Sequence, residues 1–138
     1  MLNAIKLYRI SHFLYKKNIP FLPKIIKGII FILYNSIIPY ECEIGKGTLL
    51  GYGGIAVVIH KNAVIGRNCV ISQCVTIGGK EGANGVPVIG DNVFIGAGAK
   101  VLGRIKVESN SKIGANAVVL RDVPEGKIAV GIPATIKK

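Results

Sequence analysis

The chain has 138 residues, enough for one domain with one hydrophobic core and too few for two ordinary domains. Half of the residues are hydrophobic and 18% are charged, which argues against intrinsic disorder. The 18 glycines, the absence of tryptophan and an aromatic content of 7% indicate many turns around small aliphatic side chains and not a helix bundle. The formal charge of +11 predicts an anionic partner, which leaves nucleic acid, an anionic membrane and a phosphorylated cofactor open.

The basic residues are concentrated at the N-terminus. Residues 1–40 contain six lysines and arginines, and the first acidic residue is Glu41. Apolar residues recur there at helical spacing, and Pro20 and Pro23 divide the pattern into two helices. The second helix should begin near Pro23 and present one broad apolar face, formed by Ile25, Ile26, Ile29, Ile30 and Leu33. Two interpretations stay open: these helices lie on an anionic membrane, or they pack against the rest of the protein.

Cysteine usage and the longest apolar run predict the compartment. The three cysteines, Cys42, Cys69 and Cys74, are odd in number and form no CxxC pair, so we expect a reducing compartment without disulfides or a metal site. The run at residues 29–38 lies too late for a signal peptide and is too short for a membrane-spanning helix. We therefore expect a cytoplasmic protein, peripheral at the inner membrane face if the basic helices bind lipid.

From Ile59 onward the sequence repeats with a period of six residues. Thirteen positions follow at that step, and ten of them are Ile or Val: Ile59, Ile65, Ile71, Ile77, Ile89, Ile95, Val101, Val107, Ile113 and Val119. A glycine often follows the aliphatic residue, and a small or branched side chain often comes four residues after it. This pattern predicts very short strands and tight turns, stacked in parallel along a solenoid with the aliphatic residues inward.

Two segments interrupt the period. Residues 78–87 (GGKEGANGVP) read as a loop pushed out of the coil. Residues 50–58 (LGYGGIAVV) form a second irregularity, because Ile44 and Leu50 are three residues out of phase with Ile59. Irregular segments on a regular scaffold are the usual place for function. We thus divide the chain into a basic helical segment, residues 1–40, and a solenoid, residues 41–138, with an extruded loop at 78–88.

The repeat resembles a known family. Residues 59–79 (IHKNAVIGRNCVISQCVTIGG), 95–103 (IGAGAKVLG) and 131–134 (GIPA) are similar to the left-handed parallel β-helix, or hexapeptide-repeat, acyltransferases. Within that family they most resemble serine acetyltransferases and their relatives in surface-polysaccharide biosynthesis. The resemblance implies an all-β fold, a left-handed parallel β-helix preceded here by short α-helices, which is an exception to the right-handed crossover rule. It also implies a homotrimer that binds acetyl-CoA, the acyl donor, between neighbouring prisms.

The sequence departs from the serine acetyltransferase pattern at two positions. The family's general base is a histidine in a motif like H-G-T-G-I-V-I-G-E, and that position holds Gly53 in this chain, beside Tyr52. A second family histidine precedes the proline of the extruded loop, where this chain has Val86 before Pro87. Neither replacement can take a proton from a hydroxyl group. We therefore expect an O-acetyltransferase whose acceptor is a sugar hydroxyl of a surface polysaccharide.

Three alternatives remain beside this reading. L-serine as acceptor follows from the overall resemblance. A non-catalytic β-helix that binds a partner or a nucleotide sugar is the alternative from another class. Nucleic-acid binding is the least favoured, and we expect none, because the basic helices carry no aromatic stacking motif or reading element.

His60 is the only histidine of the repeat region and our candidate catalytic base. Attack of a hydroxyl on a thioester needs a group that takes the proton, and imidazole titrates near neutral pH. His60 occupies a corner position where glycine is usual, so its side chain should project outward. Three hexads per coil would place it next to Gly78 on the following coil. The competing interpretation is an exposed corner residue without a role.

The remaining candidate residues follow from the resemblance. Small residues line the family's CoA groove, and the matching positions here are Gly78, Gly79, Ala99 and Ala117. The repeat itself also demands small residues at corners, which is the competing explanation. Lys137 could meet the CoA phosphates as a point charge or belong to a frayed basic terminus. Tyr52 could donate a hydrogen bond to the substrate or simply pack.

Overall fold

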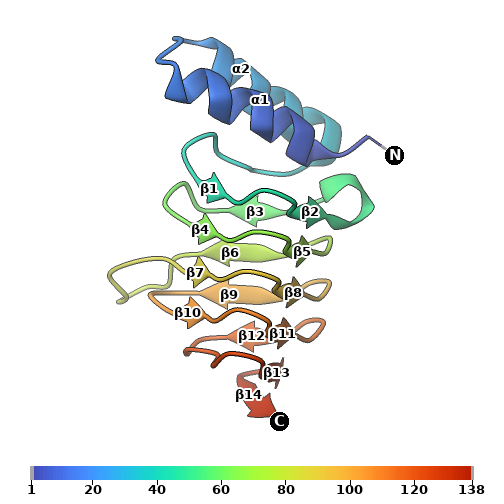
Figure 1. The fold of residues 1–138 in the computed structure, drawn as a ribbon, viewed down its shortest axis with the longest axis vertical. Helices are drawn as coiled ribbons and strands as arrows, with labels where there is room; N and C mark the ends of the chain where they lie inside the picture. Colours follow the sequence, from blue (N-terminus) through green and yellow to red (C-terminus); the bar gives the residue numbers. More distant parts are fainter. Residues whose placement is uncertain (1, 138) are drawn as a thin grey trace.

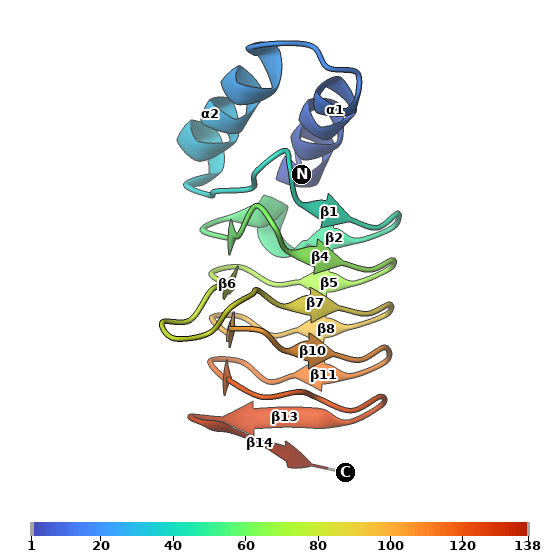
Figure 2. The same cartoon turned by 90° about the vertical axis from the view of Figure 1, so that its left-hand side faces the viewer.

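A layer of two helices lies on one end of a tall prism of short strands (Figures 1 and 2). The computed structural model describes residues 2–137. The helices are α1 (Ala4–Lys16) and α2 (Leu22–Tyr34). The C-terminus lies at the opposite end of the prism (Figure 1). The element order therefore matches the expectation of short N-terminal helices followed by a solenoid.

The prism has three faces, each of them one sheet. Sheet A contains β3 (Val58–Ile59), β6 (Thr76–Gly78), β9 (Lys100–Leu102) and β12 (Val118–Val119). Sheet B contains β1 (Glu43–Ile44), β4 (Val64–Ile65), β7 (Val88–Ile89) and β10 (Lys106–Val107). Sheet C contains β2 (Leu49–Leu50), β5 (Val70–Ile71), β8 (Phe94–Ile95), β11 (Lys112–Ile113), β13 (Ile128–Gly131) and β14 (Ala134–Lys137). All neighbours pair in parallel except β13 and β14, which form an antiparallel hairpin.

The six-residue period marks the core as predicted. All ten aliphatic residues of the repeat are at most 2% exposed. The small residues four positions later are buried as well, namely Ala63, Cys69, Val75, Val93, Ala99, Ser111 and Ala117. Each short strand thus contributes one inward side chain, and burial is shared between coils stacked above and below. The predicted parallel solenoid is confirmed.

Two insertions disturb the stacking. In an undisturbed coil, paired residues are 18 positions apart, as in Val58↔Thr76. Leu49 pairs with Val70, 21 positions on, because the short 3₁₀ segment η1 (Gly51–Gly54) adds three residues. Val64 pairs with Val88, 24 positions on, because the segment between β6 and β7 adds six residues and projects from the prism (Figure 2). Both irregularities noted in the sequence are therefore insertions into one coil each.

Helix α1 closes the open end of the solenoid. Tyr8 is fully buried, and its hydroxyl donates to the Cys42 carbonyl. The Arg9 guanidinium donates to the carbonyls of Ile44 and Gly45. A solenoid exposes unpaired backbone groups and apolar side chains at its ends, so such a cap is needed. The packing interpretation of the helical segment therefore holds for α1.

Helix α2 buries fewer of its apolar side chains than its sequence pattern predicts. It begins at Leu22, one residue before the expected start, with Pro23 in its first turn. Ile26 and Ile30 face inward, whereas Ile25, Ile29 and Leu33 are exposed. The broad apolar face is thus only partly buried. Among residues 2–137, no helix is long and apolar enough to cross a membrane.

Candidate functional site

The candidate residues lie on two different edges of the prism. The AB edge, where the chain passes from sheet A to sheet B, consists of the turn at 60–62, the loop at 79–87 and the turns at 103–105 and 120–122. The CA edge, between sheets C and A, consists of η1 and the turns at 72–75, 96–99 and 114–117. The projecting loop and η1 lie on opposite sides of the molecule in Figure 1. His60 and Gly79 lie on the AB edge, and Tyr52, Ala99 and Ala117 lie on the CA edge.

His60 is fixed by hydrogen bonds within the AB edge. Its backbone N–H donates to the Ile77 carbonyl over 2.8 Å. Its Nδ1 atom accepts the backbone N–H of Asn62 over 3.0 Å. Because the backbone amide can only donate, Nδ1 must be unprotonated, and a neutral ring carries its proton on Nε2. The half-buried side chain is thus set to donate from Nε2.

The two glycines next to His60 are not required by packing. The pairing of Ile59 with Ile77 places His60 beside Gly78, as the 18-residue coil predicts. A Cβ atom on Gly78 would meet only Thr76 Cγ2, at 4.0 Å, and one on Gly79 only Val86 Cγ1, also at 4.0 Å. Alanine would therefore fit at both positions. The two glycines leave an open shelf beside the imidazole, and the packing of the repeat does not require this open space.

The CA-edge candidates differ from this shelf. Tyr52 is 67% exposed and has φ 49° and ψ 41°, a left-handed conformation in η1. Ala99 and Ala117 are 0% exposed, so their side chains belong to the core. Their N–H groups donate to Gly96 and Gly114, and their carbonyls accept from the coil above. Because the whole residue is enclosed at both positions, these alanines do not line a groove on the surface of the single chain.

Gly53 and Val86, at the positions that match the two family histidines, lie in different surroundings. Gly53 is buried with φ 78°, a conformation that favours glycine. A Cβ on the adjacent Gly54 would lie 3.1 Å from Ala4 Cβ, so η1 is pressed against α1. Val86 is half-buried and lines a cavity beside the projecting loop. Neither position carries a titratable side chain in this chain.

Lys137 lies far from His60 along the prism. It is exposed on β14 and pairs with Ile128 at the C-terminal end of sheet C. The structure therefore does not bring it together with the AB-edge residues of the same chain.

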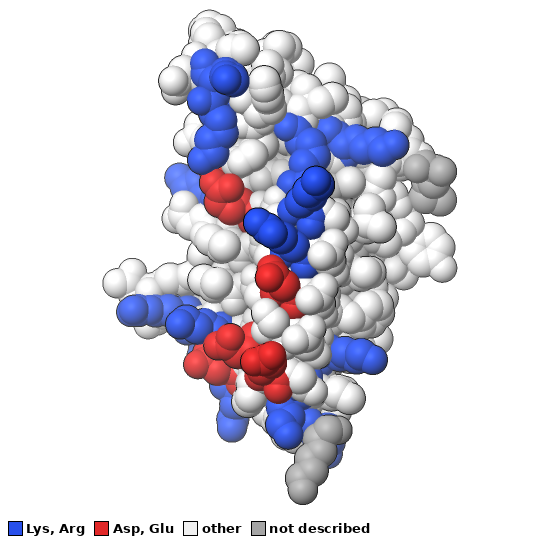
Figure 3. Space-filling model, viewed as in Figure 1, with Lys and Arg blue, Asp and Glu red and all other residues white. Residues whose placement is uncertain are grey.

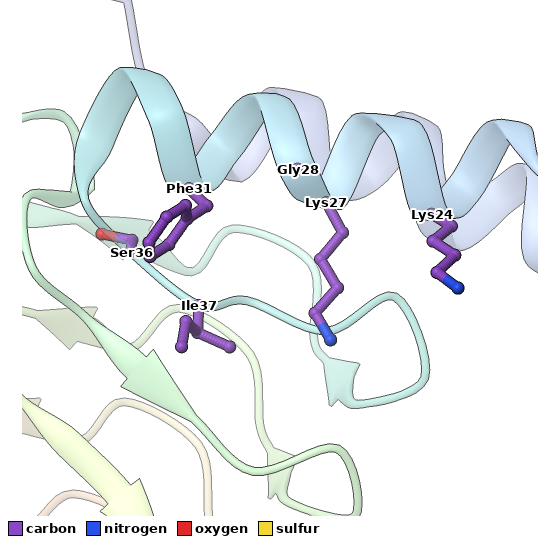
Figure 4. A pocket seen from close by; sticks show the side chains of 6 residues that line it. All are labelled: Lys24, Lys27, Gly28, Phe31, Ser36 and Ile37. Carbon is purple, nitrogen blue, oxygen red and sulfur yellow. The ribbon is translucent and has the colours of Figure 1, made fainter.

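Two cavities are relevant to a site. The loop cavity, about 530 Å³, lies on the AB edge and is lined by Asn62, Gly85, Val86, Val88, Arg104, Ile105, Lys106 and Asp122. The helix cavity, about 350 Å³, lies beneath α2, where Lys24 and Lys27 extend on one side and Phe31 faces Ile37 (Figure 4). Sequence reasoning missed both cavities. Arg104, Lys106 and Asp122 are dispersed over two coils, so only the stacking of turns shows that they share one wall.

The charge distribution distinguishes the same two regions. On the face shown in Figure 3, basic side chains lie over the helix layer and again near the projecting loop. Acidic side chains lie beside the basic ones at the level of that loop. Within the helix layer, Lys16 and His12 reach Glu43 on the first coil at 3.0 and 3.4 Å. The helix layer is thus strongly basic, whereas the loop region carries both signs.

Comparisons with known proteins identify the proteins that this chain is similar to. Residues 87–121 match the model of the bacterial transferase hexapeptide (six repeats). The chain is 38% identical to a serine acetyltransferase of Synechococcus elongatus, covering 96% of this chain and 55% of the relative. It is 43% identical to one of Staphylococcus aureus strain N315, covering 99% of this chain and 65% of the relative.

Solved structures show the same similarity to serine acetyltransferases. A soybean serine acetyltransferase complexed with serine has a TM-score of 0.89 at 39% identity, over 97% of this chain and 56% of that one. A Brucella abortus serine acetyltransferase in complex with coenzyme A has a TM-score of 0.90 at 35% identity, over 96% of this chain and 54% of that one. This chain thus has the left-handed β-helix fold, and it is similar to serine acetyltransferases over almost its whole length.

The match extends through the helix layer. Coverage of 96% or more of this chain includes α1 and α2 as well as the hexapeptide-repeat prism. The chain spans about half to two thirds of the length of these serine acetyltransferases. The predicted fold class and the resemblance to serine acetyltransferases are confirmed. The match of Gly53 and Val86 to the family's histidine positions stays a prediction.

Proposed function

We propose that the protein is an acetyl-CoA-dependent O-acetyltransferase with its reaction centre at the AB edge. The observation that carries the proposal is the shelf of Gly78 and Gly79, which packing does not require, directly beside His60. A thioester arm needs such room to approach a catalytic side chain. The relatives support the same interpretation, because one of the similar structures is a serine acetyltransferase in complex with coenzyme A.

The reaction is a direct transfer. The acceptor hydroxyl oxygen attacks the thioester carbonyl carbon, the C–O bond forms, the C–S bond breaks and CoA leaves as its thiol. The hydroxyl proton must leave the acceptor, and charge develops on the carbonyl oxygen. His60 is the AB-edge side chain suited to either event.

Two roles for His60 are chemically distinct. As the general base, it must take the acceptor proton, and its Nδ1 lone pair is already shared with the Asn62 N–H. Base catalysis therefore requires the opposite tautomer and the loss of that hydrogen bond. As a donor, Nε2–H can stabilise the developing oxyanion without rearrangement. The resting geometry favours the donor role, and the general-base role stays a prediction.

L-serine is the better supported acceptor. The relatives named above are serine acetyltransferases, and one similar structure is a soybean serine acetyltransferase complexed with serine. The sugar hydroxyl of a polysaccharide precursor is the second candidate, favoured by Gly53 and Val86 in place of the family histidines.

The deciding experiment is a CoA-release assay with acetyl-CoA. It compares L-serine with a panel of nucleotide sugars and glycans at equal concentration. We expect release with L-serine. Release with a sugar alone would reverse the order of the acceptors, and no release with any acceptor would favour the non-catalytic binding protein.

We further propose a homotrimer. Exposed apolar residues form a stripe on sheet C, where Leu49, Val70 and Phe94 are paired in register and 39–56% exposed. Val64 and Val88 form a second stripe on sheet B. If sheet B of one chain packs on sheet C of the next, the AB edge of the first meets the CA edge of the second. Tyr52 and the turns that contain Ala99 and Ala117 would then lie beside His60 in one site, which a single chain does not allow.

The helix layer is proposed to contact an anionic membrane surface. Ile25, Ile32 and Phe21 are 56%, 79% and 80% exposed, and Lys17 and Lys24 flank them. Exposed apolar side chains beside lysines, without an acidic residue before Glu41, are complementary to anionic lipid. This contact would place the protein at the inner face of the cytoplasmic membrane.

A further inference from the structure

The loop cavity has an unusual set of charges on its wall. Arg104 and Lys106 contribute two cations, and Asp122 contributes one carboxylate. The Asp122 Oδ1 atom accepts the backbone N–H of Lys106 over 2.9 Å, so this carboxylate is held against the backbone. Within residues 2–137, neither the Arg104 guanidinium nor the Lys106 ammonium has a hydrogen-bond or ion-pair partner. The wall therefore has an excess positive charge and unused donors.

Gly85 positions the Arg104 side chain. Gly85 has φ +142°, a conformation that L side chains rarely adopt. A Cβ atom there would lie 2.9 Å from Arg104 Cγ and 3.1 Å from Arg104 Cβ. The aliphatic part of Arg104 thus lies directly against the loop backbone, in space that only glycine leaves free. The loop and the turn at 103–105 are fitted to each other around this arginine.

The cavity is adjacent to His60. Asn62 lines the cavity, and its backbone N–H is the donor that holds His60 Nδ1. Val88 and Ile105 add an apolar part to the lining. A molecule of a few heavy atoms in this space could hold an anionic group at Arg104 and direct another group toward the imidazole. The cavity, at about 530 Å³, has ample volume for it.

We propose that Arg104 and Lys106 bind the anionic group of the acceptor, a carboxylate or a phosphate, and thereby orient its hydroxyl toward His60. A guanidinium presents a rigid fork of donors that matches both groups in a bidentate manner, and an ammonium adds a point charge. That the bound anion is the acceptor rests on the proposed function; the anion site itself does not. Arg104 and Lys106 are positioning residues in this scheme, and the chemistry stays at His60.

The test measures binding to the full chain by calorimetry with three probes: L-serine, L-serinamide and uridine diphosphate. Arg104→Gln should lower the affinity for the probe that binds at least about tenfold, since a charge-assisted hydrogen bond is lost. Arg104→Lys should recover part of that loss. Arg67→Gln is the matched control, because Arg67 is equally exposed but lies on the turn between sheets B and C, away from the cavity. Its affinity should equal that of the wild type.

The probes distinguish the two sources of the anion. Binding of L-serine without binding of L-serinamide identifies a carboxylate, and binding of uridine diphosphate identifies a phosphate. Asp122→Asn is a second test. The Asp122 carboxylate can accept a hydrogen bond from the ammonium group of L-serine, so its loss should lower the affinity for L-serine. The same carboxylate repels uridine diphosphate, so its loss should raise the affinity for that probe. Either pattern supports the site. Equal affinity of Arg104→Gln and wild type, or no binding of any probe, overturns it.

The CoA-release assay separates this inference from the proposed function. If the wild type releases CoA and Arg104→Gln raises the acceptor KM with little change in kcat, both stand. If it releases CoA and Arg104→Gln leaves the acceptor KM unchanged, the anion site is overturned alone. If a probe binds through Arg104 while no acceptor supports CoA release, the anion site stands and the transferase function fails.

Discussion

Gly78 and Gly79, where the AB edge begins, differ from the glycines of the turns between sheets B and C. A Cβ on Gly45, Gly66 or Gly90 would lie 2.3–2.6 Å from atoms of the next coil, so packing forbids any side chain there. A Cβ on Gly78 or Gly79 would meet nothing closer than 4.0 Å. The same residue type thus serves two purposes in one repeat. Where packing does not explain a glycine, the space it leaves is the better guide to function.

Substitution of His60, which lies beside the open shelf of Gly78 and Gly79, should give the largest effect, a loss of kcat. General-base catalysis contributes about 10²–10⁴-fold and an oxyanion donor about 10²–10³-fold, so His60→Ala should lower kcat by about 10²–10⁴-fold with little change in stability. His60→Gln separates the two roles, because glutamine can donate a hydrogen bond and cannot take a proton. Near-wild-type kcat in His60→Gln would identify a donor, and a loss equal to that of His60→Ala would identify the base. Full activity in His60→Gly would remove His60 from the mechanism.

Alanine substitutions compare the two glycine classes directly. Gly66→Ala should destabilise the fold by about 1–3 kcal/mol, because backbone of the next coil must move. Gly79→Ala should leave the free energy of unfolding within about 0.5 kcal/mol and raise the KM for acetyl-CoA. Denaturant unfolding and steady-state kinetics on both variants check this. Equal destabilisation by the two substitutions would break the distinction.

Assembly tests whether the two edges meet. Light scattering at micromolar concentration should report a trimer, and Phe94→Glu on the sheet C stripe should shift it toward monomer, because a charge would be buried in the contact. Val58→Glu is the control, because Val58 is a similarly exposed apolar residue on sheet A, which takes no part in the proposed contact. A wild-type monomer at all concentrations would leave Tyr52 and His60 on separate edges and remove the CA-edge residues from the site.

The helix layer should bind anionic vesicles at low salt. Each basic residue near an anionic surface contributes about 1 kcal/mol, so Lys17→Glu with Lys24→Glu should weaken co-sedimentation strongly, as should added salt. Lys112→Glu, far along the prism, is the matched control. Absence of wild-type co-sedimentation at low salt would make this layer a packing element only.

Alkaline pH should weaken the cap, the smallest effect expected. Burial raises the pKa of the Cys42 thiol from its usual 9.0 to about 12 and also raises the pKa of Tyr8. The fold favours the protonated forms, so stability is unchanged below about pH 9 and falls as the pH rises toward 12. Cys42→Ala should reduce the slope of that loss, and Cys74→Ala, at an exposed site, should not. Equal slopes in both variants would contradict the assignment.

The solenoid could be predicted from the sequence, since a six-residue period of Ile and Val fits no helix face or alternating strand, and the ten residues that it marks are buried in the core. The two insertions and His60 could also be located, because each breaks a strict pattern. What those features touch depends on the tertiary structure. Arg104, Lys106 and Asp122 sit in ordinary turns, and stacking alone brings them to one cavity beside Asn62. Likewise, the sequence shows Arg9 only as one of several basic helix residues. The structure shows that it donates to the carbonyls of the first coil. Periodicity records which side of a strand faces inward, whereas contacts between coils depend on residues that are distant in sequence, and no local pattern records those.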